Sequence, residues 1–200
     1  MPAAYTCINK LQCLLIQRCV PIRAHRKVLL MTTVVISTDI RRVLSEFYTC
    51  EVTSVNRQGQ PITWPATAYY DEATGQIILA ASIAFPVKAF NARHHPQVSL
   101  LYSEPTESNL VQPSTVLVQG DAIVAEIDDY TDPQVLGLFR TMVHRQPEGR
   151  RLATNRVLRR LFAWYVFQRL LIVVQPCRML VWTHGDFSFA PIEIEVKDVE

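Results

Sequence analysis

Ser82 and Lys88 are the residues of this sequence whose types and spacing best suit the binding of an anion. They flank the junction between a β-rich run and a helical pattern that begins near Pro86. Proline is favoured in the first turn of a helix, where its missing N–H is not needed. That turn leaves backbone N–H groups unpaired, and such groups bind phosphates. The pattern predicts a modest phosphate site, and the other interpretation is a solvated surface lysine.

Signatures of a self-sufficient enzyme are absent from the sequence. There is no glycine-rich phosphate loop, no nucleophile elbow and no His-Glu-x-x-His motif. The histidines show no metal-ligand spacing beyond the pair His94 and His95, for which a helix-capping role is favoured over a metal site. Five cysteines match no zinc pattern and no disulfide framework, which favours reduced thiols in a cytoplasmic protein. Such a chain takes its chemistry from a cofactor or is not an enzyme.

The length of 200 residues and the hydrophobic content of 49% indicate one domain with an appendage. Residues 1–30 contain five basic residues and no acid, so the remainder has 15 basic and 18 acidic residues, a net charge of −3. We expect 1–30 to be a basic, disordered extension, with a transit peptide as the alternative, and 31–200 to be the folded domain. The mildly acidic domain argues against nucleic acid as a partner. No window reaches the ~18 apolar residues of a membrane span.

Residues 48–102 organise the predicted fold. Turn signals at 56–59 and 71–75 separate three β-rich runs, and a short helix and a fourth strand follow. Because no helix fits between the first three runs, the pattern predicts an antiparallel meander. Pro65 lies in the second run, and proline cannot donate to a strand ladder. It should therefore lie where that strand lacks a partner, either facing a ligand or at an ordinary sheet edge.

The rest of the chain supplies further strands and the peripheral helices. A helix is predicted from Thr38, and a long strand over 114–127 should contain a bulge at Gly120. The remaining predicted elements are helices from Pro133 to about His144 and over 151–165, and strands over 167–174, 177–182 and 192–196. The sum is a mainly β protein, a small antiparallel barrel with three or four peripheral helices.

The order of these elements resembles the pyridoxamine 5'-phosphate oxidase-like, FMN-binding split-barrel family. The resemblance rests on Gly59-Gln60-Pro61, the turn at 71–75, Lys88-Ala89 and the run from His95 to Leu101. It covers residues 38–127 well and continues more loosely to Trp182. It implies an antiparallel Greek-key split β-barrel and a homodimer with FMN, or alternatively a deazaflavin, at the interface.

The resemblance also implies a set of cofactor-binding residues. A segment of the second strand and the end of the third would line the flavin, the family lysine would grip the phosphate, and a C-terminal tryptophan would complete the site. The positions in this chain are Trp64, Pro65, Ala66, Thr67, Ala80, Ala81, Ser82, Val87, Lys88 and Trp182. Val87 and Trp64 stand where the family has arginines, so two strong phosphate-binding charges are missing.

The sequence therefore predicts a cytoplasmic, homodimeric flavin-binding oxidoreductase acting on a small molecule, without metal and without membrane or nucleic-acid partners. The alternative is a non-catalytic relative that keeps the barrel dimer, with or without a flavin or deazaflavin. The fold alone does not choose between them, because one fold supports many reactions.

Overall fold

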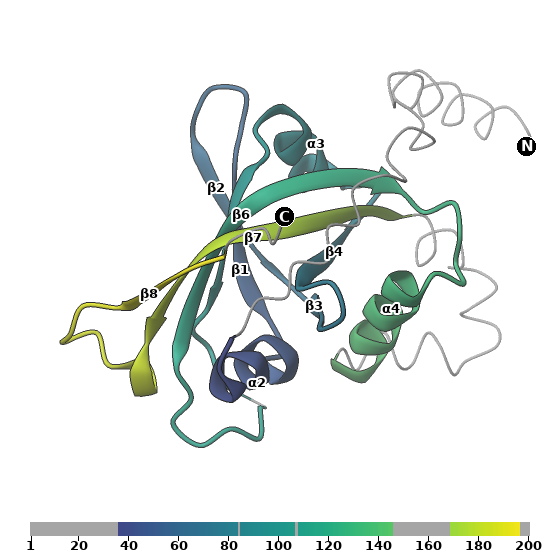
Figure 1. The fold of residues 1–200 in the computed structure, drawn as a ribbon. Coiled ribbons are helices and arrows are strands. Elements are labelled where there is room, and N and C mark those ends of the chain that lie inside the picture. The colour runs from purple at the N-terminus through teal and green to yellow at the C-terminus, as the bar shows by residue number, and fades with distance from the viewer. Residues whose placement is uncertain (1–35, 84, 107, 146–168, 197–200) are drawn as a thin grey trace, which may run out of the picture.

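The computed structural model describes residues 36–83, 85–106, 108–145 and 169–196. Within these ranges the chain is mostly β, with three α-helices at the periphery (Figure 1). In chain order the elements are α2 (Thr38–Glu46), β1 (Cys50–Val55), β2 (Pro61–Ala66), β3 (Ala68–Asp71), β4 (Gln76–Ser82), α3 (Val87–His94), β5 (Gln97–Tyr102), β6 (Thr115–Glu126), α4 (Pro133–Arg145), β7 (Arg169–Trp182), the 3-10 helix η2 (Thr183–Gly185) and β8 (Ile192–Glu195).

The strands form one antiparallel sheet in the order β2-β1-β5-β6-β7-β4-β3, with β8 added on β7. The first and last strands of this order, β2 and β3, are consecutive in the chain and are separated by Thr67 alone. The sheet therefore curls until its two ends are held by one stretch of backbone. This is the split β-barrel with peripheral helices that the sequence predicts.

Turn chemistry accounts for the first two hairpins. In the β1–β2 turn, Gly59 has a φ of +78°, and the Asn56 side chain accepts hydrogen bonds from the backbone of Gln58 and Gln60, both at 2.9 Å. In the β3–β4 turn, Gly75 has a φ of +71° and donates to the carbonyl oxygen of Asp71. Positive φ favours glycine, so both predicted turns are confirmed.

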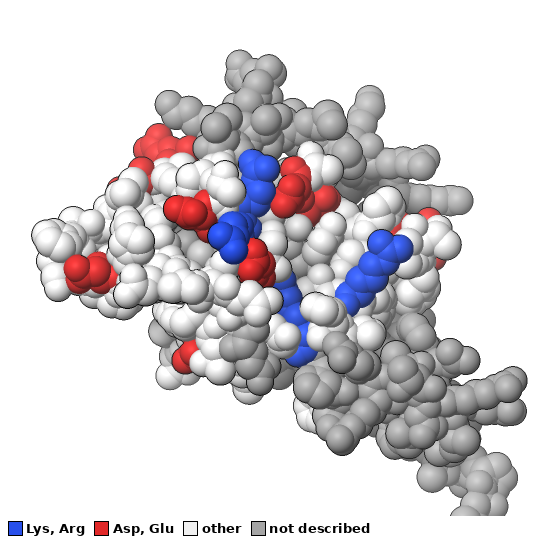
Figure 2. Space-filling view, turned by 90° about the horizontal axis from the view of Figure 1, so that it is seen from below, with Lys and Arg blue, Asp and Glu red and all other residues white. Residues whose placement is uncertain are grey.

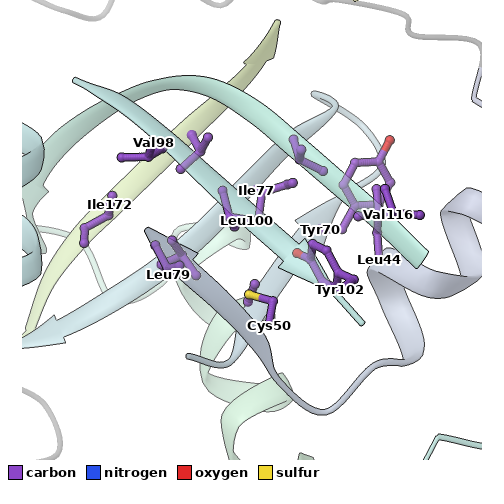
Figure 3. Close-up of a cluster of buried hydrophobic side chains, with 14 of the residues drawn as sticks. Leu44, Cys50, Tyr70, Ile77, Leu79, Val98, Leu100, Tyr102, Val116 and Ile172 are labelled. Atoms are coloured by element: carbon purple, nitrogen blue, oxygen red, sulfur yellow. The ribbon is translucent and has the colours of Figure 1, made fainter. Parts of the chain in front are cut away.

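The two faces of the sheet have different partners. The inner face of β4 contributes Ile77 and Leu79 to the main core, which Figure 3 shows surrounding Cys50 and Tyr102. The alternate residue Ile78 faces outward and packs against α4. Burial of each large aliphatic side chain contributes roughly 1.5–3 kcal/mol, so this alternation fixes the register of β4.

Helix α2 closes the main core. Ser37 is its N-cap, with the side-chain oxygen accepting from the backbone N–H of Ile40 at 3.4 Å. Ile40, Val43 and Leu44 form its buried stripe. The helix begins at Thr38, as the sequence predicts.

Two predictions about strand boundaries are wrong. Residues 169–182 form the single strand β7, where the sequence predicted two strands, over 167–174 and 177–182. The ladder with β4 ends at Val174 and that with β8 begins at Arg178, so Pro176 lies where neither strand requires its N–H. Its β6 partner is Gly120, at the predicted register shift. The predicted second strand is also divided, at Thr67.

The face formed by α2 and α4 carries basic and acidic side chains next to one another (Figure 2). Arg42 pairs with Glu46 at 3.0 Å, and Arg41 lies 3.9 Å from Glu72. Charges of both signs thus alternate on this face. Within the described ranges no helix is long and apolar enough to cross a membrane. The predicted extension 1–30 and the predicted helix 151–165 lie outside the described residues.

Gly120 gives a test of the β6–β7 register. A Cβ at this position would lie 2.2 Å from the carbonyl oxygen of Gln175. Because that oxygen belongs to the backbone, Gly120→Ala should lower the free energy of unfolding by about 1–3 kcal/mol in a urea titration. Asp121→Ala, at the exposed neighbouring position, should stay within about 0.5 kcal/mol of the wild type. Equal stability of the two variants would contradict this register.

Candidate functional site

The split in the barrel lies between β2 and the end of β4, which do not pair with each other. The β3–β4 ladder ends at the pair Ala68 and Leu79. If that register continued, Thr67 would face Ala80 and Ala66 would face Ala81. Instead β2 follows β1 and the end of β4 follows β7. The predicted cofactor segments, 64–67 and 80–82, therefore lie on the two backbone edges that diverge at the split.

Strand β2 is an edge strand within the described part of the chain, because its only ladder partner there is β1. Pro65 is exposed at this edge, as its missing N–H predicts. Trp64 is 41% exposed and lies opposite the buried Val52. This partly exposed tryptophan stands at the position where the family that the sequence resembles has an arginine.

The predicted phosphate residues come together at the start of α3. The chain turns after β4 through a hydrogen bond from Phe85 N–H to the carbonyl oxygen of Ser82 at 3.0 Å. Pro86 is the N-cap residue and makes no side-chain capping bond, so the first N–H groups of α3 have no capping side chain. Val87 is 47% exposed, and Lys88 next to it is half-buried. This arrangement supplies the ammonium and the helix terminus that an anion site requires.

Electrostatics make Lys88 an unusual lysine. Burial lowers its pKa, the Cys50 thiol acts in the opposite direction, and the charge of Arg169 lowers the pKa further. Cys50 pairs with Ala66 at the end of β2, and Arg169 pairs with Ser82 at the end of β4. The electrostatic environment of Lys88 therefore includes residues paired with both edges of the split.

Arg169 is a residue of this site that sequence reasoning missed. It is the first residue of β7 and the ladder partner of Ser82. The sequence placed it in a strand but gave no pairing for that strand. Pairing between segments so distant in the chain leaves no local pattern, and no signal in the sequence identifies it.

Two other missed residues hold the chain on either side of Thr67. The Cys50 thiol donates to the carbonyl oxygen of Ala66, with sulfur and oxygen 3.6 Å apart. The Arg145 guanidinium donates to the carbonyl oxygen of Ala68 at 3.1 Å and to that of Ser45. Arg145 is buried, and burial lowers its pKa. An unpaired buried carbonyl is costly, so these bonds fix the backbone at the split.

Trp182 does not join the other predicted residues within one chain. It ends β7, whereas Arg169 begins it, and thirteen residue steps correspond to roughly 43 Å along the strand. Strand β7 indeed crosses the molecule in Figure 1. Trp182 packs against Phe187, with ring centroids 5.3 Å apart, and Phe187 is 64% exposed. Within one chain this aromatic pair is therefore far from the split.

The site offers binding groups rather than reactive ones. Among the described residues, no group of three or more His, Cys, Asp or Glu side chains could hold a metal ion. The thiol nearest the split, Cys50, has its pKa raised to about 12 by burial, which keeps it protonated and unreactive at neutral pH. The arrangement offers an ammonium group and a helix start without a capping side chain to an anion, and any electron transfer would be the ligand's chemistry.

Comparison with known proteins supports the fold. No protein-family model and no curated protein sequence matches this chain. Among solved structures, a conserved hypothetical protein from Mycobacterium tuberculosis matches with a TM-score of 0.51 and 19% identity, over 76% of this chain and 88% of its own. A heme binding protein from Mycobacterium smegmatis matches with a TM-score of 0.51 and 11% identity, over 81% of this chain and 60% of its own.

A pyridoxamine 5'-phosphate oxidase-related, FMN binding protein from Nostoc punctiforme is also similar, with a TM-score of 0.47 and 14% identity, over 85% of this chain and 87% of its own. Identities this low show a shared fold alone. The strand order and the peripheral helices agree with the split-barrel fold that the resemblance implies.

The raised pKa of Cys50 predicts a loss of stability in alkali. Its ordinary value is 9.0, and in the folded protein it is about 12. The folded state therefore keeps a proton that the unfolded chain loses above pH 9. This stabilisation is full below pH 9 and falls by about 1.4 kcal/mol per pH unit from there toward pH 12.

Urea titrations between pH 7.5 and 10.5 test this. The stability difference between the wild type and Cys50→Ala should shrink by about 2 kcal/mol above pH 9. Cys177→Ala, at the exposed cysteine, should follow the wild type at every pH. A difference for Cys50→Ala that does not change with pH would show that the thiol titrates normally.

Proposed function

We propose that this protein binds FMN at the split of its barrel and uses it, as a homodimer, for oxidoreductase chemistry on a small molecule. The observation that carries the proposal is the meeting of the two diverging strand edges with the uncapped start of α3 at Lys88. A flavin has a planar ring with polar edges and a phosphate at the end of its chain. The split offers backbone groups to the ring, and it offers a cation and helix N–H groups to the phosphate.

The chemical types of the residues at the split fit the parts of this cofactor. Lys88, the Ser82 hydroxyl and the first N–H groups of α3 would hold the phosphate. The β2 edge with Trp64, and the end of β4, would line the ring. When bound, the flavin would supply hydride or electron transfer, while the protein positions it and limits its contact with water. A deazaflavin with a similar phosphate would use the same groups.

The non-catalytic alternative rests on the lack of reactive side chains at the split. Cys50 is held protonated, and the remaining predicted residues are apolar, hydroxyl or cationic groups. A protein that binds the cofactor but shows no turnover with a panel of electron donors and acceptors would belong to this class. Turnover with any donor–acceptor pair would exclude it.

The binding proposal is tested by the visible spectrum and by titration. The purified protein, mixed with FMN or with a deazaflavin and then desalted, should retain flavin-like absorbance. If neither ligand binds at tens of micromolar, the proposal fails. A retained Soret band would instead indicate a heme ligand.

Lys88 should contribute a large part of the affinity for the phosphate. A charged hydrogen bond contributes about 1.5–3 kcal/mol, so Lys88→Ala should weaken FMN binding by roughly one to two orders of magnitude. Riboflavin has no phosphate and should bind the variant as it binds the wild type. Fluorescence titration with both ligands measures the contrast. Equal weakening for both, or no change for either, would place the phosphate elsewhere.

The position of Trp182 supports the proposed homodimer. If this residue completes a flavin site, the site must combine Lys88 of one chain with Trp182 of the other, since the two lie at opposite ends of β7 within a chain. The exposed Phe187 beside Trp182 would then be covered by the partner. Two-fold symmetry gives two such sites, each built from both chains.

Mixed dimers test this shared site. Lys88→Ala and Trp182→Ala homodimers should each bind FMN weakly. When the two variants are co-expressed with different tags and the mixed dimer is isolated, both lesions fall in one of its sites and the other site is intact. Half of the wild-type high-affinity binding should return. If no high-affinity site returns, the two residues do not act in one site across the interface.

A further inference from the structure

We propose that Arg169 is the second phosphate-binding cation of this site and replaces, from strand β7, the arginines that positions 64 and 87 lack. The inference rests on the proposed function, because it concerns the phosphate of the same cofactor. It assigns a specificity-determining role to a residue outside every segment in which the sequence predicted one.

The sheet register places Arg169 at the site. Arg169 and Ser82 are the last pair of the β4–β7 ladder, and residues directly opposite in an antiparallel pair point to the same face. Two residues along each strand, Ala80 pairs with Leu171, and both pack in the outer apolar cluster against α4. Arg169 and Ser82 therefore continue this outer row beyond the cluster, where the row becomes polar.

Lys88 follows this end of β4 in the chain, at the start of helix α3. The turn closed by Ser82 and Phe85 leads directly into α3, which packs against β4 and β7. The charge of Arg169 lowers the pKa of Lys88, so the two cations lie within electrostatic reach of one another. A dianion bound between the two groups would be attracted by both of their charges.

The pair suits a phosphate monoester better than a singly charged group. Lysine supplies a point charge, whereas the planar guanidinium of arginine can donate two parallel hydrogen bonds to two phosphate oxygens. The other basic residues of α3, Arg93 and His94, lie in its last turn, at the far end from Lys88. Arg169 thus supplies the guanidinium that Val87 and Trp64 cannot.

The test compares two arginines of the same strand. Arg178 lies near the opposite end of β7 and pairs with Glu193 on the surface, so Arg178→Gln is a matched control for Arg169→Gln. The affinities of both variants and of Arg169→Lys for FMN and riboflavin are measured by fluorescence titration, with thermal melts to establish folding.

Arg169→Gln should weaken FMN binding by roughly ten- to a hundredfold and leave riboflavin binding unchanged. Arg169→Lys should recover only part of the loss, because it restores the charge without the fork. Arg178→Gln should match the wild type. Inorganic phosphate should compete with FMN on the wild type and compete less well on Arg169→Gln.

The outcomes separate this inference from the proposed function. If the wild type binds no flavin, both fail together. If Lys88→Ala loses FMN affinity while Arg169→Gln binds FMN as the wild type does, the flavin site stands and the role of Arg169 is overturned. Two further results would contradict the proposal that the Arg169 guanidinium binds the phosphate. One is an equal loss of affinity for FMN and riboflavin in a folded Arg169→Gln protein. The other is full recovery of FMN affinity in Arg169→Lys.

Discussion

The fold depends on a single crossing of the chain from one end of the sheet to the other. Strand β2 pairs with β1, and after Thr67 the same backbone pairs with β4 as β3. The two ends of the sheet therefore cannot move apart, yet they cannot pair fully either. The carbonyl groups on both sides of Thr67 accept hydrogen bonds from buried Cys50 and Arg145. The opening is thus a fixed part of the barrel.

The candidate site inherits its geometry from this constraint. The edge of β2 stays without a second ladder partner within the described part of the chain, and the last residues of β4 turn toward β7. The turn after Ser82 then brings the start of α3 to the opening. Each contributing group lies at the end of a regular element, where backbone groups remain available to a ligand.

The helices and turns could be predicted from local residue patterns. The candidate site depends instead on pairing between segments that are distant in the chain. The Ser37 cap, the glycines of the first two turns and the Gly120 irregularity are each visible within a few residues of sequence. The division at Thr67 is not visible in the local sequence, because it depends on which strand each half pairs with. The prediction of two strands, one on each side of Pro176, was wrong for a related reason. Proline breaks a strand only where a neighbour needs its N–H, and here the ladders of β4 and β8 leave that position between them.

Strand β7 has a consequence for how a dimer would respond to its ligand. Its first residue, Arg169, pairs with Ser82 at the end of β4, and its last residue lies some 43 Å away along a strand that β6 pairs with from Leu170 to Trp182. In the proposed dimer each copy of β7 would touch both cofactors, one with Arg169 and the other with Trp182. Ordering one site would then order part of the other, and thermodynamic linkage would make the two affinities depend on one another.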